Sequence, residues 1–541
     1  MRAWRGLGAA VVSLALSCAA AAAAPDGDAR DGAQATLRTL LSGPGTQAFG
    51  KGADEQDRLI EFYALRDYVP AWTGSDEAEA RADRVRTALV HADEQGLSPK
   101  DYAVAPKQAT SGVAAARQDL ALTAAVLRYA SDVHTGKIVP AAAYDDVRLP
   151  APDFDAAKAL QASLRRGRLD AFLAELPPSS PQYRALVAAL ARYRAVAAKG
   201  GWKQVSASSK PAAMAARLAL EDVEIVTLDD PNTADVADAL MRYQARNGLK
   251  LDGEAGSDTL HALNLSVAWR IKQIQANMER ERWLPREMEA RAIVVNAADE
   301  SLDFMRRGEP LLHSRVVVGK ASSPTPILRA EVKAVIANPA WDIPDMIADE
   351  ILPKVRKDSD YLADHNIVLA DGPAGDPSGR SVDWDAVRRG HVPYQLRQAP
   401  GTGNVLGTLM LDMPNDFDVY LHDTPNKKLF DADLRTASHG CVRVEQIVPL
   451  ASLVMTGDPE EGTQKLSDAI ATGQTQRFEL DEAIPVYLVY RTAIAQADGT
   501  AGFRLDRYGR DKRLAALLDA PRPVAVPLPA VTARAEPETI H

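Results

Sequence analysis

The apolar pattern of this 541-residue chain changes at about residue 290, and this change limits the folds open to it. Before that point apolar residues recur at helical spacing, as at Leu122, Val126, Tyr129 and Val133, which predicts a buried helix stripe. Beyond it, β-branched runs bounded by glycine and proline predict strands at 292–296, 315–319, 331–336, 418–422 and 484–490. The expected fold class is therefore multidomain α+β, with helices first and a mostly β domain after them.

Breaks in composition divide the chain into six expected segments. Residues 340–400 interrupt the strands with polar sequence, prolines, glycines and two tryptophans, which is typical of a lid over a sheet domain. Prolines crowd the end of the chain and predict a disordered tail. The expected boundaries are 1–24 for a signal peptide, 25–209 for a helical scaffold, 210–266 for a small helical module, 267–495 for the mostly β domain with its lid at 340–400, 496–520 for a helical segment and 521–541 for the tail.

The first 24 residues have the pattern of a secretory signal. Arg2 and Arg5 give a positive start, an apolar stretch follows, and small residues at 19–24 supply a cleavage zone. Cys18 raises the alternative of a lipoprotein anchor, which the preceding residues 15–17 fit poorly. No other segment is apolar for long enough to span a membrane. The sequence therefore predicts a soluble protein exported to the periplasm by a cleaved signal.

The charge and cysteine counts exclude several functional classes. With 63 basic and 73 acidic residues the net charge is −10, which argues against a nucleic-acid partner. Two cysteines rule out a disulfide framework and a Cys-rich metal centre, and no cofactor or metal is expected. If Cys18 leaves with the signal, Cys441 is a lone thiol in an oxidising compartment, and a functional reason for its presence is expected.

That reason is suggested by the residues around Cys441. A thiol attacks a carbonyl as the thiolate, so it needs a basic neighbour, which His422 can supply across the 16-residue connection 423–438. Gly440 allows the backbone to approach a substrate closely, so the amides of Gly440 and Cys441 could face a developing oxyanion. Arg443 lies two residues on, where it could hold a carboxylate or fix the loop.

Two roles stay open at this point. His439 is a rival base, because it precedes Cys441 by two residues. The group that orients His422 could be Tyr420, Asp423 or a backbone carbonyl.

These motifs resemble a known family. The segment Ser438-His-Gly-Cys-Val-Arg443, with His422 upstream, resembles the active-site signature of the L,D-transpeptidases of bacterial cell walls. Residues 238–264 resemble the small three-helix peptidoglycan-binding module, with a helical hairpin that spaces two domains as the less favoured alternative. The chain further resembles the large multidomain members of the family, which have a scaffold, such a module and a capping subdomain. This resemblance covers roughly residues 55–515 and is clearest at 315–320, 324–326, 338–344, 351–354, 381–384 and 421–425.

The resemblance implies a reaction and roles for particular residues. Cys441 would form a thioester with a peptidoglycan stem tetrapeptide and release D-Ala, and the third residue of a second stem would then take the acyl group, which links two third residues. His422 would be the base and acid, and the amides of Gly440 and Cys441, with that of His439 as a further candidate, would form the oxyanion hole. Carbapenem acylation of the thiol, a role in cell-wall synthesis and cell shape, and contacts with other cell-wall synthases follow by the same analogy. The candidate substrate-binding residues are Arg443, Ser438, Asp423, Thr424 and Trp341.

Three alternatives compete with this reading. Water as the acceptor would make the protein an L,D-carboxypeptidase. A non-catalytic peptidoglycan-binding protein would use the 210–266 module, but the Cys–His–Gly set counts against it. A papain-like protease gains little support, because here the histidine precedes the cysteine.

Overall fold

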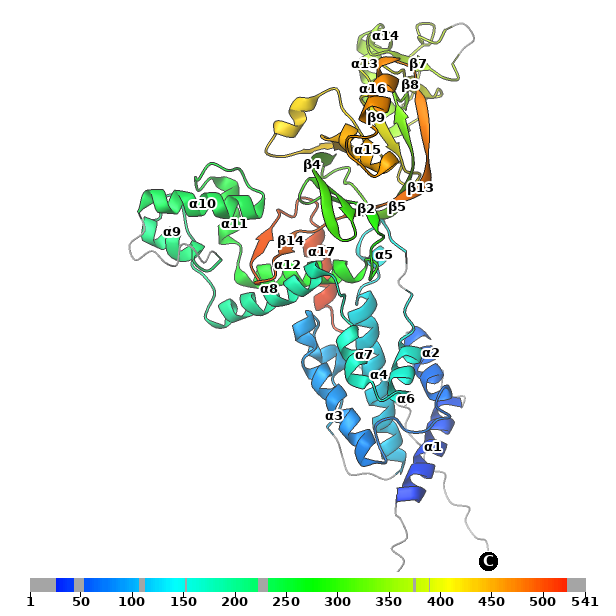
Figure 1. Ribbon diagram of the computed structural model, residues 1–541, viewed down its shortest axis with the longest axis vertical. Coiled ribbons are helices and arrows are strands. Elements are labelled where there is room, and N and C mark those ends of the chain that lie inside the picture. Colours follow the sequence, from blue (N-terminus) through cyan, green and yellow to red (C-terminus); the bar gives the residue numbers. More distant parts are fainter. Residues whose placement is uncertain are drawn as a thin grey trace, which may run out of the picture. The chain divides into compact units, whose positions relative to one another are not determined.

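The chain is a multidomain α+β protein with a helical N-terminal region and a β-rich region after it (Figure 1). A computed structural model describes residues 26–42, 53–106, 112–150, 153–221, 232–372, 376–388 and 390–522. The expected signal segment 1–24 with Cys18, and the tail beyond residue 522, lie outside the described residues. The described residues divide into two compact units, the first within residues 26–87 and 104–126 and the second within residues 88–103 and 127–522.

The first unit is helical and is organised around a buried carboxylate. Asp119 is fully buried, and it accepts hydrogen bonds from the Tyr63 hydroxyl (2.6 Å) and from the main-chain N–H groups of Ala71 (2.9 Å) and Trp72 (2.8 Å). These bonds satisfy an acid that burial alone would destabilise. The helices are α1 (Asp26–Ser42), α2 (Ala53–Ala64), α3 (Asp76–Val90) and the first part of α4 (Gly112–Thr135). The predicted stripe at 122, 126, 129 and 133 is confirmed, because all four side chains are buried along α4.

A small helical group in the second unit carries the 210–266 module. Its helices α9, α10 and α11 share a core. Gly248 ends α10 with φ +61°, in the left-handed region that a helix C-terminus favours for glycine. The other helices before the sheet are η2 (Ala92–Gln95), η3 (Pro99–Tyr102), α5 (Pro140–Ala143), α6 (Ala156–Arg165), α7 (Leu169–Glu175), α8 (Pro181–Ala198), α9 (Pro211–Leu218), α10 (Thr233–Asn247), α11 (Ser257–Asn264) and α12 (Val267–Arg282).

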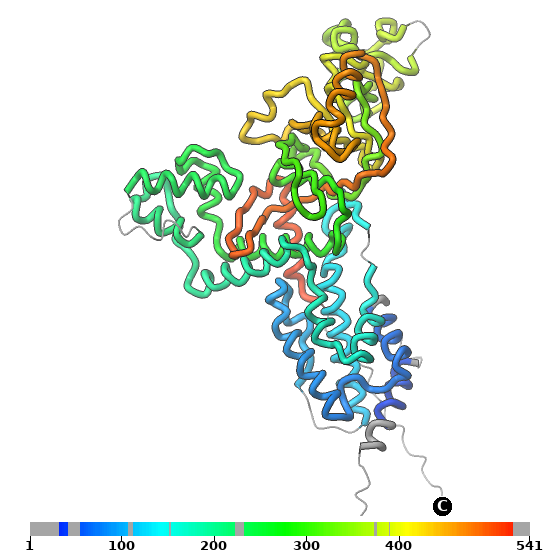
Figure 2. Tube along the Cα trace, viewed as in Figure 1, coloured from blue at the N-terminus to red at the C-terminus, as the bar shows by residue number. Residues whose placement is uncertain are grey.

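The β-rich region is built on one large sheet. Its strand order is β1-β5-β13-β2-β3-β4-β12-β10-β9, β11 pairs with β4, and a further β5–β9 pairing closes the strands into a ring. β2 and β13 are far apart in the sequence but lie side by side as a parallel pair (Figure 2). The strands are β1 (Val147–Arg148), β2 (Arg291–Asn296), β3 (Ser301–Arg306), β4 (Glu309–Gly319), β5 (Ile327–Ala337), β9 (Leu409–Asp412), β10 (Leu421–His422), β11 (Thr436–Ser438), β12 (Val442–Val444) and β13 (Gln476–Val489).

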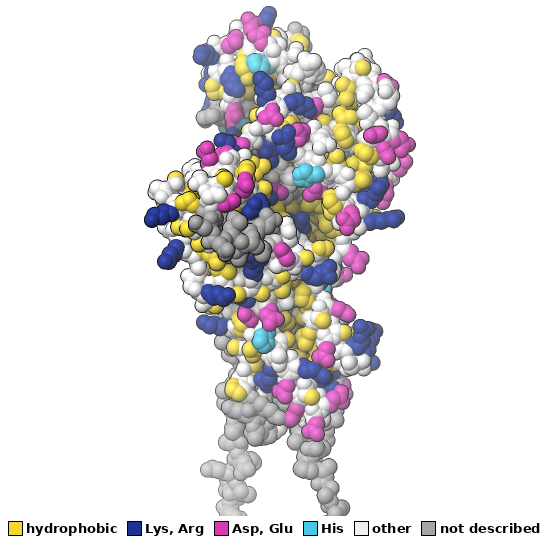
Figure 3. Space-filling model, turned by 60° about the vertical axis from the view of Figure 1, so that its left-hand side comes forward, with side chains coloured by type: hydrophobic (Ala, Val, Ile, Leu, Met, Phe, Trp, Pro, Cys, Tyr) yellow, Lys and Arg dark blue, Asp and Glu magenta, His cyan; other side chains and the backbone are white. Residues whose placement is uncertain are grey.

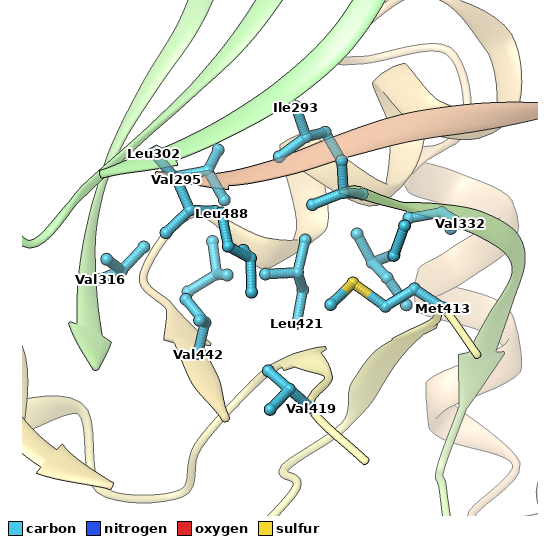
Figure 4. Close-up of a cluster of buried hydrophobic side chains, with 14 of the residues drawn as sticks. Ile293, Val295, Leu302, Val316, Val332, Met413, Val419, Leu421, Val442 and Leu488 are labelled. Carbon is cyan, nitrogen blue, oxygen red and sulfur yellow. The ribbon is translucent and has the colours of Figure 1, made fainter. Parts of the chain in front are cut away.

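The sheet encloses the main hydrophobic core, in which Ile293, Val316, Leu421, Val442 and Leu488 converge (Figure 4). All five are fully buried and come from five different strands. Four of the five predicted strands are confirmed. The strand expected at 418–422 is wrong for its first three residues, because Asp418 has φ +51°, a left-handed value that breaks extended structure.

Residues 341–398 form an insertion between β5 and β9 with a core of its own. Ile343, Ile351, Leu362 and Leu396 make up part of that core, and Trp384 packs against it. The elements are β6 (Trp341–Asp342), α13 (Asp345–Lys357), α14 (Tyr361–Asp364), β7 (Ile367–Leu369) and β8 (Leu396–Gln398). We call this insertion the lid.

The remaining elements lie after β10 in the sequence. They are η5 (Lys427–Asp431), α15 (Ile447–Thr456), α16 (Thr463–Ala471), β14 (Ala493–Ala495), β15 (Ala501–Phe503) and α17 (Arg510–Asp519). Among the residues with described positions, no helix is long and apolar enough to cross a membrane. Basic and acidic side chains are interspersed over the face drawn in Figure 3.

Candidate active site

The pairing of β10 with β12 positions the four chemically important side chains. Leu421 pairs with Val442 in parallel register, and both side chains are buried in the core. Because side chains alternate along a strand, the residues on either side of this pair face away from the core. Those residues are Tyr420, His422, Cys441 and Arg443. We call the side of the sheet that they share the catalytic face.

Cys441 is a free, half-buried thiol at the end of the turn before β12. Its Sγ lies 3.7 Å from the carbonyl oxygen of Asp418, to which the thiol can donate. Burial raises the pKa of Cys441, and hydrogen bonding from the Tyr420 main chain and the charge of Arg443 act against that rise. The resting group is therefore a protonated thiol, which needs a base to become a nucleophile.

His422 is the candidate base, and it is held neutral. The side chain is only 3% exposed. Burial, followed by the nearby charge of Arg443, lowers the pKa of His422 to about 4. Its Nδ1 has no hydrogen-bond partner among the described residues, so neither Tyr420 nor Asp423 orients the ring through that atom. A neutral imidazole on the same face as a protonated thiol can accept its proton.

The turn before Cys441 is held by hydroxyl groups. The N–H of Gly440 donates to Ser438 Oγ (3.1 Å), and that hydroxyl donates to the carbonyl of Cys441 (2.5 Å). Thr325 Oγ1, which is fully buried, donates to the Gly440 carbonyl (2.8 Å). Gly440 has φ +118°, a conformation that side chains rarely adopt. Ser438 thus shapes the turn, and the Gly440 amide is engaged inside it.

His439 lies beside Lys320 and the lid. Its Nε2 lies 2.9 Å from Lys320 Nζ and 3.0 Å from Glu350 Oε1, which belongs to α13. Lys320 and Glu350 are themselves 3.7 Å apart. We call the cluster of Lys320, Glu350 and His439 the latch. Lys320 directly follows β4 and Glu350 lies in the lid, so the latch links the lid to the turn that precedes Cys441.

Asp423 and Thr424 are buried in supporting roles. Asp423 Oδ2 accepts hydrogen bonds from the N–H (2.9 Å) and hydroxyl (2.8 Å) of Thr408, and Oδ1 pairs with Lys427. Burial raises the pKa of Asp423, but these contacts outweigh it and the net shift is downward. Thr424 Oγ1 accepts the N–H of Asn426 (3.3 Å) and stabilises the following turn.

The side chain of Arg443 is unpaired among the described residues. Its guanidinium makes no hydrogen bond or ion pair with any described residue, and its Nε is buried. Burial lowers the pKa of Arg443, with the Cys441 charge acting in the opposite direction. An unpaired cation on the catalytic face is suited to bind a carboxylate.

Tyr420 lies near Asp418 and Cys441, whereas Trp341 is part of the lid. Burial, followed by the charges of Asp418 and Cys441, raises the pKa of Tyr420 to about 12, so it stays protonated at neutral pH. Trp341 pairs with Gln398 in the lid sheet and packs on the lid core.

A separate cavity of about 840 Å³ contains none of the predicted site residues. It is lined by the end of α10, by β4 and by the connection 423–438, whose course can be followed in Figure 2. No group of three or more His, Cys, Asp or Glu residues in the described ranges is arranged to hold a metal ion. Sequence reasoning gave no role to Thr325, Lys320, Glu350 and Asp418, because only the fold brings them to the Cys441 turn.

Two parts of the chain match models of known protein families. Residues 290–461 match the family model of the L,D-transpeptidase catalytic domain, and residues 57–190 match that of the scaffold domain. A protein of Haemophilus influenzae, designated a candidate L,D-transpeptidase, is 34% identical over 223 residues. That match covers 41% of this chain and 45% of the relative, so the chain spans less than half the length of the curated relative it matches.

Proposed function

We propose that this protein, whose residues 290–461 belong to the L,D-transpeptidase catalytic-domain family, is a cysteine-dependent L,D-transpeptidase that cross-links peptidoglycan stem peptides. The bond formed joins the third residues of two stems, of the meso-diaminopimelate type, and releases D-Ala, in synthesis or remodelling of the cell wall. The single observation that carries the proposal is the pairing of β10 with β12, which sets His422 opposite Arg443 and leaves Cys441 one residue before the paired Val442. A periplasmic location is part of the proposal and rests on the sequence of residues 1–24 alone.

The first half-reaction uses the neutral Cys441–His422 pair. His422, with a pKa lowered by burial to about 4, accepts the thiol proton as Sγ attacks the carbonyl carbon after the third stem residue. The C–N bond to D-Ala breaks, and His422 returns the proton to the leaving amine. A thioester between the stem tripeptide and Cys441 remains.

In the second half-reaction an amine from another stem attacks the thioester carbonyl. The C–S bond breaks, an amide forms, and Cys441 is restored as a thiol. The amide energy is conserved through the thioester, so the exchange needs no nucleotide.

Main-chain N–H groups around the turn would stabilise the oxyanion. Those of Cys441, Gly440 and His439 are the candidates, and the Gly440 amide must first exchange its bond to Ser438 Oγ. His439 itself is a weaker candidate for the base, because its Nε2 faces Lys320 and Glu350.

Substrate binding would centre on Arg443. Its unpaired guanidinium is suited to the carboxylate of a stem peptide, and a bound carboxylate would satisfy the buried Nε. Ser438, Asp423 and Thr424 would act by shaping the walls of the site, and Trp341 by supporting the lid.

Purified tetrapeptide muropeptides provide the test, with products identified by mass. The wild-type protein should form dimers with loss of D-Ala, Cys441→Ala should form none, and His422→Gln should lose about 10³-fold or more in rate. His391→Gln is the matched control, because His391 is an exposed histidine of the lid. Circular dichroism checks that each variant is folded. Dimers from Cys441→Ala would overturn the proposal.

The same experiment separates the competing functions. Tripeptide monomers without dimers would identify water as the acceptor and make the protein an L,D-carboxypeptidase. No product, together with alkylation of Cys441 no faster than that of a free cysteine, would favour a peptidoglycan-binding role without catalysis. A carbapenem should add its mass to the wild-type protein and leave Cys441→Ala unchanged.

A further inference from the structure

The loop between β9 and β10 places one acidic residue beside the nucleophile. Asn415 fixes the loop, because its Nδ2 donates to the carbonyls of Met413 (2.7 Å) and Val419 (2.8 Å). Its Oδ1 accepts the N–H of Phe417 (3.1 Å). Asp418 contributes no side-chain hydrogen bond to this arrangement, so the loop does not depend on its carboxylate.

The backbone of Asp418 contacts the nucleophile directly. Its carbonyl oxygen lies 3.7 Å from Cys441 Sγ, so Asp418 borders the reacting sulfur, and the charge of its carboxylate acts on Cys441. The side chain is exposed, and its carboxylate forms no hydrogen bond or ion pair with any described residue.

The neighbouring acids differ from Asp418 in this respect. Asp412, at the end of β9, pairs with Arg477 at 2.7 Å. Asp342, in the lid, pairs with Arg397. Of these three acids, all close enough to act on Tyr420, only Asp418 has no cationic partner in the described chain.

An unpaired carboxylate at this place works against the thiol chemistry. Burial is the main cause of the raised pKa of Cys441, and the charge of Asp418 raises it further. A cation bound at Asp418 would neutralise that charge. The catalytic face therefore has an unpaired anion, Asp418, and an unpaired cation, Arg443, both near Cys441 and both acting on its charge.

We propose that the Asp418 carboxylate binds the ammonium group of the stem peptide that acts as acyl acceptor, beside the Cys441 thioester. This inference rests on the proposed function and names the acceptor subsite. The subsite would bind a primary alkylammonium group beside Asp418, while Arg443 would remain available to bind a carboxylate. It makes Asp418 a determinant of whether an amine or water takes the acyl group.

The step balances without any further reactant. The bound ammonium loses one proton to neutral His422, and its nitrogen forms a bond to the thioester carbonyl carbon. The C–S bond then breaks, and the second amine proton ends on sulfur as the Cys441 thiol. His422 gives its proton to solvent, and Asp418 is left free for the next ammonium.

The variant Asp418→Asn tests the proposal with little change in shape, because asparagine also tolerates the left-handed backbone. The ratio of dimer to tripeptide products should fall at least tenfold, and KM for the acceptor amine should rise. Alkylation of Cys441 by uncharged iodoacetamide should become about two- to fivefold faster, because the opposing charge has gone. These two effects have opposite signs, which a general disturbance of the loop would not produce.

Two further variants complete the design. Asp416→Asn is the matched control, because Asp416 lies in the same loop and its carboxylate pairs with Arg148 at 3.4 Å, so its products should match wild type. Asp418→Gly removes the charge and relieves the backbone, and it should behave like Asp418→Asn. An unchanged product ratio in both Asp418 variants, with wild type still forming dimers, would overturn this inference alone. A wild-type protein that forms no dimers would overturn the proposed function and this inference together.

Discussion

Two regions of the second unit contain buried polar groups, and the regions differ in how fully those groups are paired. Along α12, the buried Arg280 pairs with Asp511 (2.7 Å) and donates to the Tyr144 hydroxyl (2.9 Å). On the catalytic face, the whole guanidinium of Arg443 and the Nδ1 of His422 have no hydrogen-bond partner among the described residues, whereas the α12 arginines lack a partner only at Nε. The α12 region joins elements of the fold, whereas the catalytic face is open to a ligand.

The partners of α12 explain why its charges are structural. Arg282 pairs with Glu279 (2.7 Å), and Glu281 pairs with Arg491 (2.6 Å), so charges in a buried helix are compensated by opposite charges. Buried charges without such partners are unfavourable unless something else binds them. The contrast therefore marks the catalytic face as the place where substrate supplies the missing partners.

The largest expected effect comes from removing one arginine from each region. Arg280→Met leaves Asp511 buried without its main cation, and it should lower the free energy of unfolding by about 3–5 kcal/mol. Arg443→Met breaks no ion pair, so stability should change by about 1 kcal/mol or less while kcat/KM for muropeptides falls roughly 10- to 100-fold. Urea unfolding and product analysis measure the two quantities. A large loss of stability in Arg443→Met would show that the two regions do not differ.

The next effect is the pH dependence that His422 imposes on stability. Its pKa is lowered by burial to about 4 in the folded protein, against an ordinary value near 6.5. Between these values the unfolded chain binds a proton that the folded chain does not, so stability falls as pH drops from about 6.5 to 4, by about 2–3 kcal/mol.

The variant His422→Asn should remove that slope. Urea unfolding at pH 7 and pH 4.5 would show a smaller stability loss in His422→Asn than in wild type. His391→Asn, at an exposed site, should keep the wild-type slope. His134, whose pKa is also lowered to about 4, contributes a slope that both variants retain. Equal slopes in all three proteins would contradict burial as the cause of the His422 shift.

Long elements could be predicted from the sequence because their patterns are local. The β-branched runs that became β2 and β5, and the stripe of α4, were recognisable from spacing alone. The short pair β10 and β12 was not, because Asp418 interrupts the expected run with a left-handed residue.

The site residues themselves were found by motif, but their partners were not. Cys441 and Arg443 lie in one short signature, and His422 precedes it. Glu350 reaches His439 across 89 positions of sequence, and no local pattern predicts such a contact. The buried charges of α12 were missed for the same reason, since a helix this polar has the pattern of a solvated one.

Two glycines offer a smaller test of how open the catalytic face is. A Cβ at Gly407, where φ is +66°, would lie 2.5 Å from the Cβ of Asp423. A Cβ at Gly440, where φ is +118°, would meet nothing closer than 3.6 Å. Gly407→Ala should therefore cost about 2–3 kcal/mol from clash and backbone strain, and Gly440→Ala about 1–2 kcal/mol from the backbone alone. Thermal unfolding measures both, and a larger cost at Gly440 would contradict the open face.

The smallest expected effect on stability is at the latch, where the lid meets the turn that carries Cys441. A hydrogen bond from His439 is the main cause of the lowered pKa of Glu350, but the carboxylate is exposed, so Glu350→Gln should leave stability nearly unchanged. Catalysis should still respond, because the charge of Glu350 holds His439 and Lys320 to one side of the turn. We expect kcat/KM to change several-fold and to lose its dependence on ionic strength. Asp345→Asn, an exposed acid on the same helix, should match wild type. If the two variants behave alike, the lid is joined to the site by packing and not by this charge.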